Sequence, residues 1–149
     1  MRKNKDYFVF FSLVYSYIRG KKQKVMLTEG IKYTATTVVT DEKCAHHVGS
    51  GALPVFATPS LVALMENAAM QAVAPSLPEG STTVGGAINI LHTRPSAMGQ
   101  EVSATATLTA IEGRKLTFSV AACDKNGTIG EGTHVRFIVD ARRFMEKVK

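Results

Sequence analysis

Residues 57–75 read ATPSLVALMENAAMQAVAP, and this stretch predicts one long helix. Thr58 is a residue type that caps helix N-termini through its hydroxyl, and Pro59 suits the first helical position, where no N–H is needed. Pro75 predicts an end near Ala74, because the residue before a proline avoids the helical region. Apolar side chains occupy every face, so we expect the helix to be buried nearly all round.

Glu66 is the only charged residue between the two prolines of this helix. Its neighbours one turn away are apolar, so the helix itself offers no cation to pair with it. Because an unpaired buried carboxylate is costly, we expect Glu66 to be protonated, paired from elsewhere in the fold, or facing a cleft. The alternative is a surface position on a polar strip with Asn67 and Gln71. The functional interpretation is a catalytic carboxylate.

Composition predicts a globular protein of one domain. The chain has 149 residues, of which 45% are hydrophobic and 20% are charged. The two cysteines form no disulfide framework and are expected to be free thiols in a reducing, cytoplasmic setting. The net charge of +6 resides in residues 1–25, which hold seven of the 18 basic and one of the 12 acidic groups. Residues 26–149 are therefore neutral overall, and we expect no nucleic-acid partner.

Residues 1–25 differ in character from the rest of the chain. Basic residues flank an apolar, aromatic run over residues 7–18. This run is too short to span a bilayer, and no small-residue cleavage site follows it. Three interpretations of residues 1–25 compete. The segment is an extension from an upstream start codon, with Met26 the natural initiator. Alternatively it is a membrane-surface anchor, or an extra element packed on the domain. We favour the extension, so the predicted domain is 26–149 and any membrane contact is confined to residues 1–25.

Runs of β-branched or alternating apolar residues predict five strands, at residues 31–40, 84–94, 101–111, 115–123 and 128–140. The Asn126-Gly127 pair predicts a tight hairpin before the last strand. The polar stretch 41–54 is expected to be a loop, and residues 141–149 a basic tail. Cys44, His46 and His47 in that loop lack a second ligand cluster, so we expect no metal site.

The order of one strand, one helix and four strands predicts an α+β fold. An antiparallel sheet of about five strands needs one face covered, and the long helix is the natural cover. This is the hot-dog arrangement, in which a sheet wraps around one buried helix. A single helix leaves a sheet edge and a cleft unfinished, so we expect a homodimer, or a tetramer.

Four stretches together resemble a known family. The chain resembles the hot-dog thioesterases of the fluoroacetyl-CoA thioesterase type over about residues 30–146. The resemblance rests on residues 55–58 (VFAT), 61–69 (LVALMENAA), 84–93 (VGGAINILHT) and 132–136 (GTHVR). The spacing of a threonine, a glutamate eight residues later and a histidine twenty-six residues after that is its most specific feature.

The resemblance implies hydrolysis of an acyl-CoA thioester with Thr58, Glu66 and His92 as catalytic residues. It also implies substrate contacts from Gly85, its neighbour Gly86, and Arg136. No cofactor or metal is expected, because CoA is part of the substrate. The family's lid carries phenylalanines over the acyl group, whereas residues 48–54 contain no aromatic residue. We therefore expect a different, larger or less selective acyl pocket.

The residue types allow two mechanisms. In one, Glu66 orients His92, which acts as the base for an attacking Thr58. In the other, Glu66 activates water while Thr58 and His92 supply hydrogen bonds. The main rival function is a module that binds acyl-CoA without turnover, and a hydratase or a membrane-surface protein are further alternatives. A binding module needs no such set of three residues, so we favour the enzyme.

Overall fold

The computed structural model describes residues 26–149. The predictions made for residues 1–25 lie outside this described part. The strands are β1 (Lys32–Val38), β2 (Ser81–His92), β3 (Glu101–Glu112), β4 (Lys115–Asp124) and β5 (Gly127–Asp140). The helices are η1 (Asp41–Lys43), α2 (Ala45–Val48), α3 (Thr58–Val73), η2 (Ala74–Ser76) and α4 (Ala141–Glu146).

The predicted long helix is α3, and its two prolines mark it as expected. Pro59 lies in the first turn, and the α-helix ends at Val73, where the short η2 containing Pro75 takes over. The predicted cap is wrong. Ala57 is the N-cap residue and no side chain caps the helix, because the Thr58 hydroxyl turns to a different partner.

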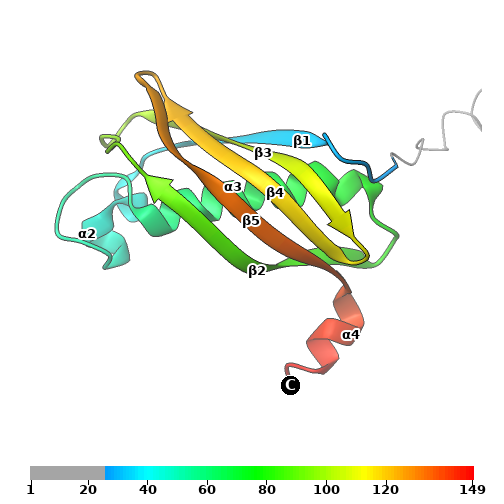
Figure 1. The fold of residues 1–149 in the computed structure, drawn as a ribbon. Helices are drawn as coiled ribbons and strands as arrows, with labels where there is room; N and C mark the ends of the chain where they lie inside the picture. The colour runs from blue at the N-terminus through cyan, green and yellow to red at the C-terminus, as the bar shows by residue number, and fades with distance from the viewer. Residues whose placement is uncertain (1–25) are drawn as a thin grey trace, which may run out of the picture.

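The five strands form one antiparallel sheet in the order β1-β3-β4-β5-β2. Figure 1 shows α3 lying along one face of this sheet, where it packs chiefly against β1 and β3. The predicted α+β architecture of one long helix and about five strands is therefore confirmed. The inward residues of β3 and β4 alternate as predicted and are buried with α3 in a single core.

Two segments hold more helix than the sequence predicted. The expected loop contains η1 and α2, and α2 ends at Gly49, whose positive φ of 81° a glycine adopts without strain. The expected tail contains α4, which the Asp140 side chain caps by accepting a hydrogen bond from the backbone N–H of Arg143. Figure 1 shows α4 projecting away from the end of β5.

Strand β2 is an edge strand with an irregularity at its centre. It pairs only with β5, and the register shifts between Gly85 and Ala87 so that Gly86 has no partner on β5. Such a bulge leaves one backbone unit out of the ladder and re-aims the strand. Within residues 26–149, no helix has the length and apolar character needed to cross a bilayer.

Candidate active site

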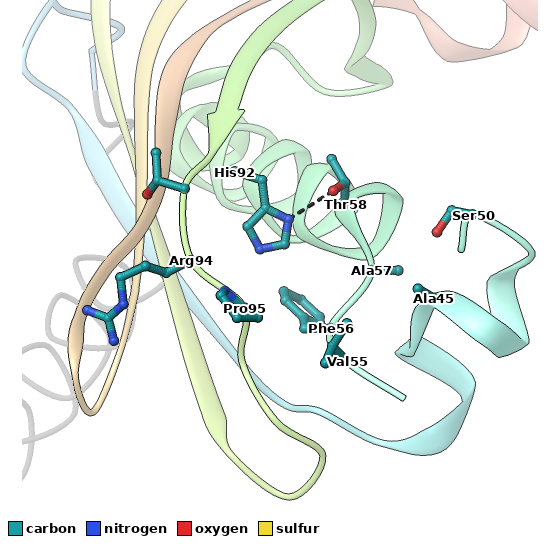
Figure 2. Close-up of a pocket in the computed structure, with 10 residues that line it drawn as sticks. Ala45, Ser50, Val55, Phe56, Ala57, Thr58, His92, Arg94 and Pro95 are labelled. Atoms are coloured by element: carbon teal, nitrogen blue, oxygen red, sulfur yellow. Dashed lines mark hydrogen bonds between the residues drawn. The ribbon is translucent and has the colours of Figure 1, made fainter. Parts of the chain in front are cut away.

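Thr58 and His92 meet where α3 begins and β2 ends. The Thr58 hydroxyl oxygen lies 2.9 Å from His92 Nδ1, and Figure 2 shows the two side chains facing each other. Thr58 is the first residue of α3 and His92 the last of β2, so both sit at the ends of rigid elements. The structure therefore brings together two of the three predicted catalytic residues.

The burial of His92 determines how its protons are arranged. Burial lowers the pKa of His92, so the imidazole is neutral at pH 7. Its Nε2 is buried and has no hydrogen-bond partner among residues 26–149. A backbone hydrogen bond with Arg94 opposes this shift in the pKa. With the proton on Nδ1, His92 would donate to the Thr58 oxygen and leave the hydroxyl hydrogen of Thr58 for another acceptor.

A cavity of about 260 Å³ adjoins this pair. The segment after β1 and the residues that follow β2 line it with small or apolar side chains: Ala45, Ser50, Val55, Phe56, Ala57 and Pro95. Arg94 also borders the cavity, but Figure 2 shows its guanidinium turned away from His92. That group donates to the Asn126 carbonyl and lies 3.7 Å from the Asp124 carboxylate, so it is held at the β4–β5 hairpin.

Glu66 belongs to a second cluster, about two turns further along α3. Its side chain is 41% exposed, and its Oε1 lies 3.9 Å from Nε2 of the fully buried His134. Among residues 26–149, no group donates a hydrogen bond to this carboxylate. The cation that the helix itself lacks comes from β5, where Arg136 acts on Glu66 through its charge. Of the expectations for Glu66, a position beside a cation from another element is the one observed.

Arg136 is buried, and three hydrogen bonds fix its guanidinium. Nε donates to the Thr83 hydroxyl and Nη2 to the Thr83 carbonyl, each at 2.8 Å. Nη1 donates to His134 Nε2 at 3.1 Å. Burial lowers the pKa of Arg136 and the Glu66 carboxylate opposes that shift, but a guanidinium stays charged. The Arg136 guanidinium is therefore a fixed positive charge near the Glu66 carboxylate.

Gly85 keeps this cluster open. A Cβ at position 85 would lie 3.0 Å from Glu66 Oε1 and 3.8 Å from Arg136 Nη1. A side chain at position 85 would crowd the Glu66 carboxylate, so the glycine lets β2 pass close to both charged groups. The neighbouring Gly86 is the unpaired residue of the bulge, so its N–H takes no part in the ladder with β5.

Within one chain the two clusters are separate. Thr58 and Glu66 are eight residues apart on a straight helix, which corresponds to roughly 12 Å. No hydrogen bond joins Glu66 to His92 in the described residues. The predicted orientation of His92 by Glu66 is therefore absent from the single chain. Gly85 and Arg136 lie near Glu66, and their substrate contacts stay a prediction.

Sequence reasoning missed the supporting roles of His134 and Thr83. The period of two along β5 places His134 and Arg136 on the same face, and that alternation was the available signal. The two acidic residues of β5, Glu131 and Asp140, form no ion pair or hydrogen bond with Arg136 among the described residues. Thr83 stands on the neighbouring strand β2, and nothing in the local sequence marks it.

The cysteine and the two histidines in residues 41–54 have different hydrogen-bond partners. Cys44 is buried, and its thiol donates to the Thr40 carbonyl. His46 and His47 are exposed and both contact the Asp41 carboxylate, at 2.9 and 3.1 Å. The described structure thus places these side chains as local supports of α2.

A long helix laid along one five-stranded antiparallel sheet defines the hot-dog fold. Solved structures agree. A hot-dog-like protein from Thermanaerovibrio acidaminovorans superposes with a TM-score of 0.74 at 21% identity, over 82% of this chain and 90% of that one, which supports the fold. A thioesterase-superfamily protein of Thermus thermophilus reaches a TM-score of 0.75 at 28% identity, over 81% and 90% of the two chains.

The chain belongs to the fluoroacetyl-CoA-specific thioesterase family, whose model matches residues 39–142. The fluoroacetyl-CoA thioesterase of Streptantibioticus cattleyicolor is 42% identical over 95 residues, covering 64% of this chain and 68% of that protein. The structure of the fluoroacetyl-CoA thioesterase FlK superposes with a TM-score of 0.78 at 36% identity, over 83% and 96% of the two chains. The predicted family and the prediction of a thioesterase enzyme are confirmed.

Proposed function

We propose that this thioesterase hydrolyses an acyl-CoA thioester to the free acid and CoA, with Thr58, Glu66 and His92 as its catalytic residues. The observation that carries the proposal is the Glu66 carboxylate. It faces a fixed guanidinium across Gly85, receives no hydrogen bond within the described chain, and is open to solvent. A carboxylate in that state can take a proton from water.

In the proposed reaction Glu66 activates the attacking water. Arg136 and the free N–H of Gly86 polarise the thioester carbonyl and stabilise the oxyanion that forms on it. Thr58 accepts a hydrogen bond from His92 and donates its own to the reacting thioester. The departing thiolate of CoA takes the proton that Glu66 removed from water. Hydrolysis in this form requires no cofactor.

We propose that a homodimer completes the site, with a tetramer as the larger assembly. In one chain Thr58 and Glu66 are separated by roughly 12 Å along the helix axis, and no hydrogen bond joins the Thr58–His92 pair to Glu66 among the described residues. The free edge of β2 carries Gly85 and ends at His92, so a second subunit along this edge is placed to complete the cleft. The proposed arrangement combines the Thr58–His92 pair of one subunit with the Glu66 cluster of the other. We expect the enzyme to act in the cytoplasm, where CoA esters are formed and used.

The acyl group is proposed to enter the cavity beside Thr58 and His92. Related proteins are named for fluoroacetyl-CoA, whose acyl group has only two carbons. Here, small side chains such as Ala45 and Ser50 line the cavity, and residues 48–54 contribute no aromatic ring. We therefore propose that this enzyme accepts acyl groups larger than fluoroacetyl.

The test is free-thiol release from short, branched, aromatic and long acyl-CoAs, with wild type compared with Glu66→Ala and His92→Ala. We expect turnover of at least one ester larger than acetyl, and its loss in both variants while circular dichroism shows them folded. Binding of acyl-CoA without turnover of any ester would contradict the proposal and favour a sensor. Strict preference for fluoroacetyl-CoA would contradict the larger acyl group alone.

A further inference from the structure

His134 is a buried, titratable side chain that the proposed reaction does not use. Its side chain has no exposed surface, and both of its ring nitrogens are hydrogen-bonded. Nδ1 lies 2.8 Å from the Ala87 carbonyl on β2, directly after the bulge. Nε2 lies 3.1 Å from Nη1 of Arg136. The imidazole thus connects the bulged strand with the guanidinium.

These partners determine the protonation of His134. A carbonyl only accepts and a guanidinium only donates, so Nδ1 carries the proton and Nε2 carries the lone pair. A second proton on Nε2 would point at the positively charged Arg136. Burial lowers the pKa of His134 and Arg136 lowers it further, while the Ala87 carbonyl and Glu66 oppose both effects. The ring is therefore neutral, and its 3.9 Å approach to Glu66 is not an ion pair.

The neutral ring has two consequences for the groups around it. It accepts one N–H of Arg136, and the two bonds to Thr83 complete the fixation of the guanidinium. It also has no N–H to offer to Glu66, because the nitrogen nearer the carboxylate is already an acceptor. The lone pairs of Glu66 therefore stay available.

We propose that His134 is a positioning residue of the thioesterase site: as a neutral imidazole it fixes the Arg136 guanidinium and withholds a hydrogen bond from Glu66. This role rests on the proposed function of Glu66 as the base. A histidinium at this position would place a second positive charge beside Glu66 and weaken it as a base. The proposal therefore assigns the activity of Glu66 partly to a residue that does not touch the substrate.

A matched pair of variants separates the two bonds of His134. The amide of His134→Asn reaches the position of Nδ1 and keeps the bond to Ala87, but it does not reach Arg136. The longer amide of His134→Gln presents an oxygen to Arg136 in place of Nε2. We expect kcat to fall about 30-fold in His134→Asn and less than about fivefold in His134→Gln, with KM nearly unchanged in both. The exposed His47→Asn serves as the control and should match wild type.

A wild type that hydrolyses no acyl-CoA would overturn the proposed function itself. If wild type is active and His134→Asn keeps full kcat, only the role of His134 is overturned. A loss in His134→Gln equal to that in His134→Asn would also overturn it, because the acceptor for Arg136 would not matter. Should the variants fail to fold, nitrogen-15 NMR of the wild-type rings decides. We expect a protonated Nδ1 and a bare Nε2 on His134 at about pH 6.5, where an unperturbed imidazole is half protonated, and the opposite tautomer or a histidinium would refute the proposal.

Discussion

The Thr58–His92 pair and the Glu66–His134–Arg136 cluster lie about two turns apart along α3 and are supported differently. The Thr58–His92 pair depends on one hydrogen bond at the exposed start of α3, next to the cavity described above. The cluster rests on a buried imidazole and a buried guanidinium whose bonds reach two strands. Each nevertheless leaves one group unengaged, the Thr58 hydroxyl hydrogen in the first and the Glu66 carboxylate in the second.

This difference distinguishes the groups that hold the site in shape from the groups that can react with a substrate. Groups that bind each other fully hold the site in shape, as the Arg136 bonds to Thr83 do. Groups left without a partner are the ones that can meet a substrate. The comparison assigns proton abstraction to the Glu66–His134–Arg136 cluster and a hydrogen-bonding role to the Thr58–His92 pair. The following predictions test that assignment.

The largest effect is expected from Glu66→Gln, which removes the base and keeps its shape. We expect thioester turnover to fall about 1000-fold, within the range measured for loss of a general base. Stability should change little, because Glu66 is 41% exposed and receives no hydrogen bond within the described chain. Stopped-flow thiol release together with thermal melting would measure both. A variant with a tenth or more of wild-type turnover would show that Glu66 is not the base.

Mixing two inactive variants tests whether the clusters of different subunits act together. Glu66→Gln and His92→Ala homodimers each carry a defect in both shared sites, but their mixed dimer regains one intact site. After co-refolding we expect about a quarter of wild-type turnover, because random pairing yields half mixed dimers. This is a gain of about 250-fold over Glu66→Gln, which is expected to keep about a thousandth of wild-type turnover. Light scattering would confirm the dimer.

A mixture that stays inactive would show that the Thr58–His92 pair of one subunit and the Glu66 cluster of the other do not form one site. The matched control is a mixture of Glu66→Gln with Glu66→Ala, which should gain nothing. Both mixtures share the same refolding procedure, so a difference between them reports only on the sharing of sites.

Arg136→Met is expected to cost stability as well as activity. The change leaves the Thr83 hydroxyl and the His134 Nε2 buried without a donor. We expect the free energy of unfolding in urea to drop by about 2–4 kcal/mol. Arg142→Met is the control, because Arg142 is 86% exposed and its pair with Glu146 is worth under about 0.5 kcal/mol. Equal losses in both variants would contradict the structural role of Arg136.

Thr58 tests the looser pair. Thr58→Val removes the hydroxyl that is proposed to donate to the thioester, and Thr58→Ser keeps it. We expect about a 10- to 100-fold loss of kcat in the first and a loss within about threefold in the second. The melting temperature should hold in both, since this hydroxyl caps no helix. Accumulation of an acyl-enzyme in rapid-quench samples would contradict this role and make Thr58 a nucleophile.

The elements were predictable where the chain marks them locally. Two prolines bound α3, alternation defined β3 and β4, and the Asn126-Gly127 pair marked the last hairpin. The short helix α2 was missed, because one turn of helix has no periodic pattern to read. It forms through contacts that only the fold supplies, such as the bridge between Cys44 and Phe56.

The site was only partly predictable for a related reason. Thr58 and His92 are 34 residues apart, yet their spacing within a family pattern identified both. The family pattern did not reveal that Glu66 faces β5 and not His92. That depends on how far α3 runs along the sheet, which is a property of the packed core. The cap assigned to Thr58 failed similarly, because a histidine distant in sequence competes for its hydroxyl.

The smallest expected effect is on the pH dependence of stability. Both His92 and His134 have a folded-state pKa lowered by burial, so the unfolded chain binds protons more readily. Their contribution to stability is complete above the unfolded pKa of about 6.5 and is lost as the pH falls below it. Each histidine adds at most about 1.4 kcal/mol per pH unit to the slope.

Urea titrations from about pH 7.5 to about pH 5 lie above the main carboxylate range and isolate these two rings. We expect His134→Gln to reduce the slope and His47→Asn to preserve it, because His47 is exposed. A flat profile in wild type would show that both rings accept a proton in the folded state at little cost, and the neutral His134 on which the cluster depends would be ruled out.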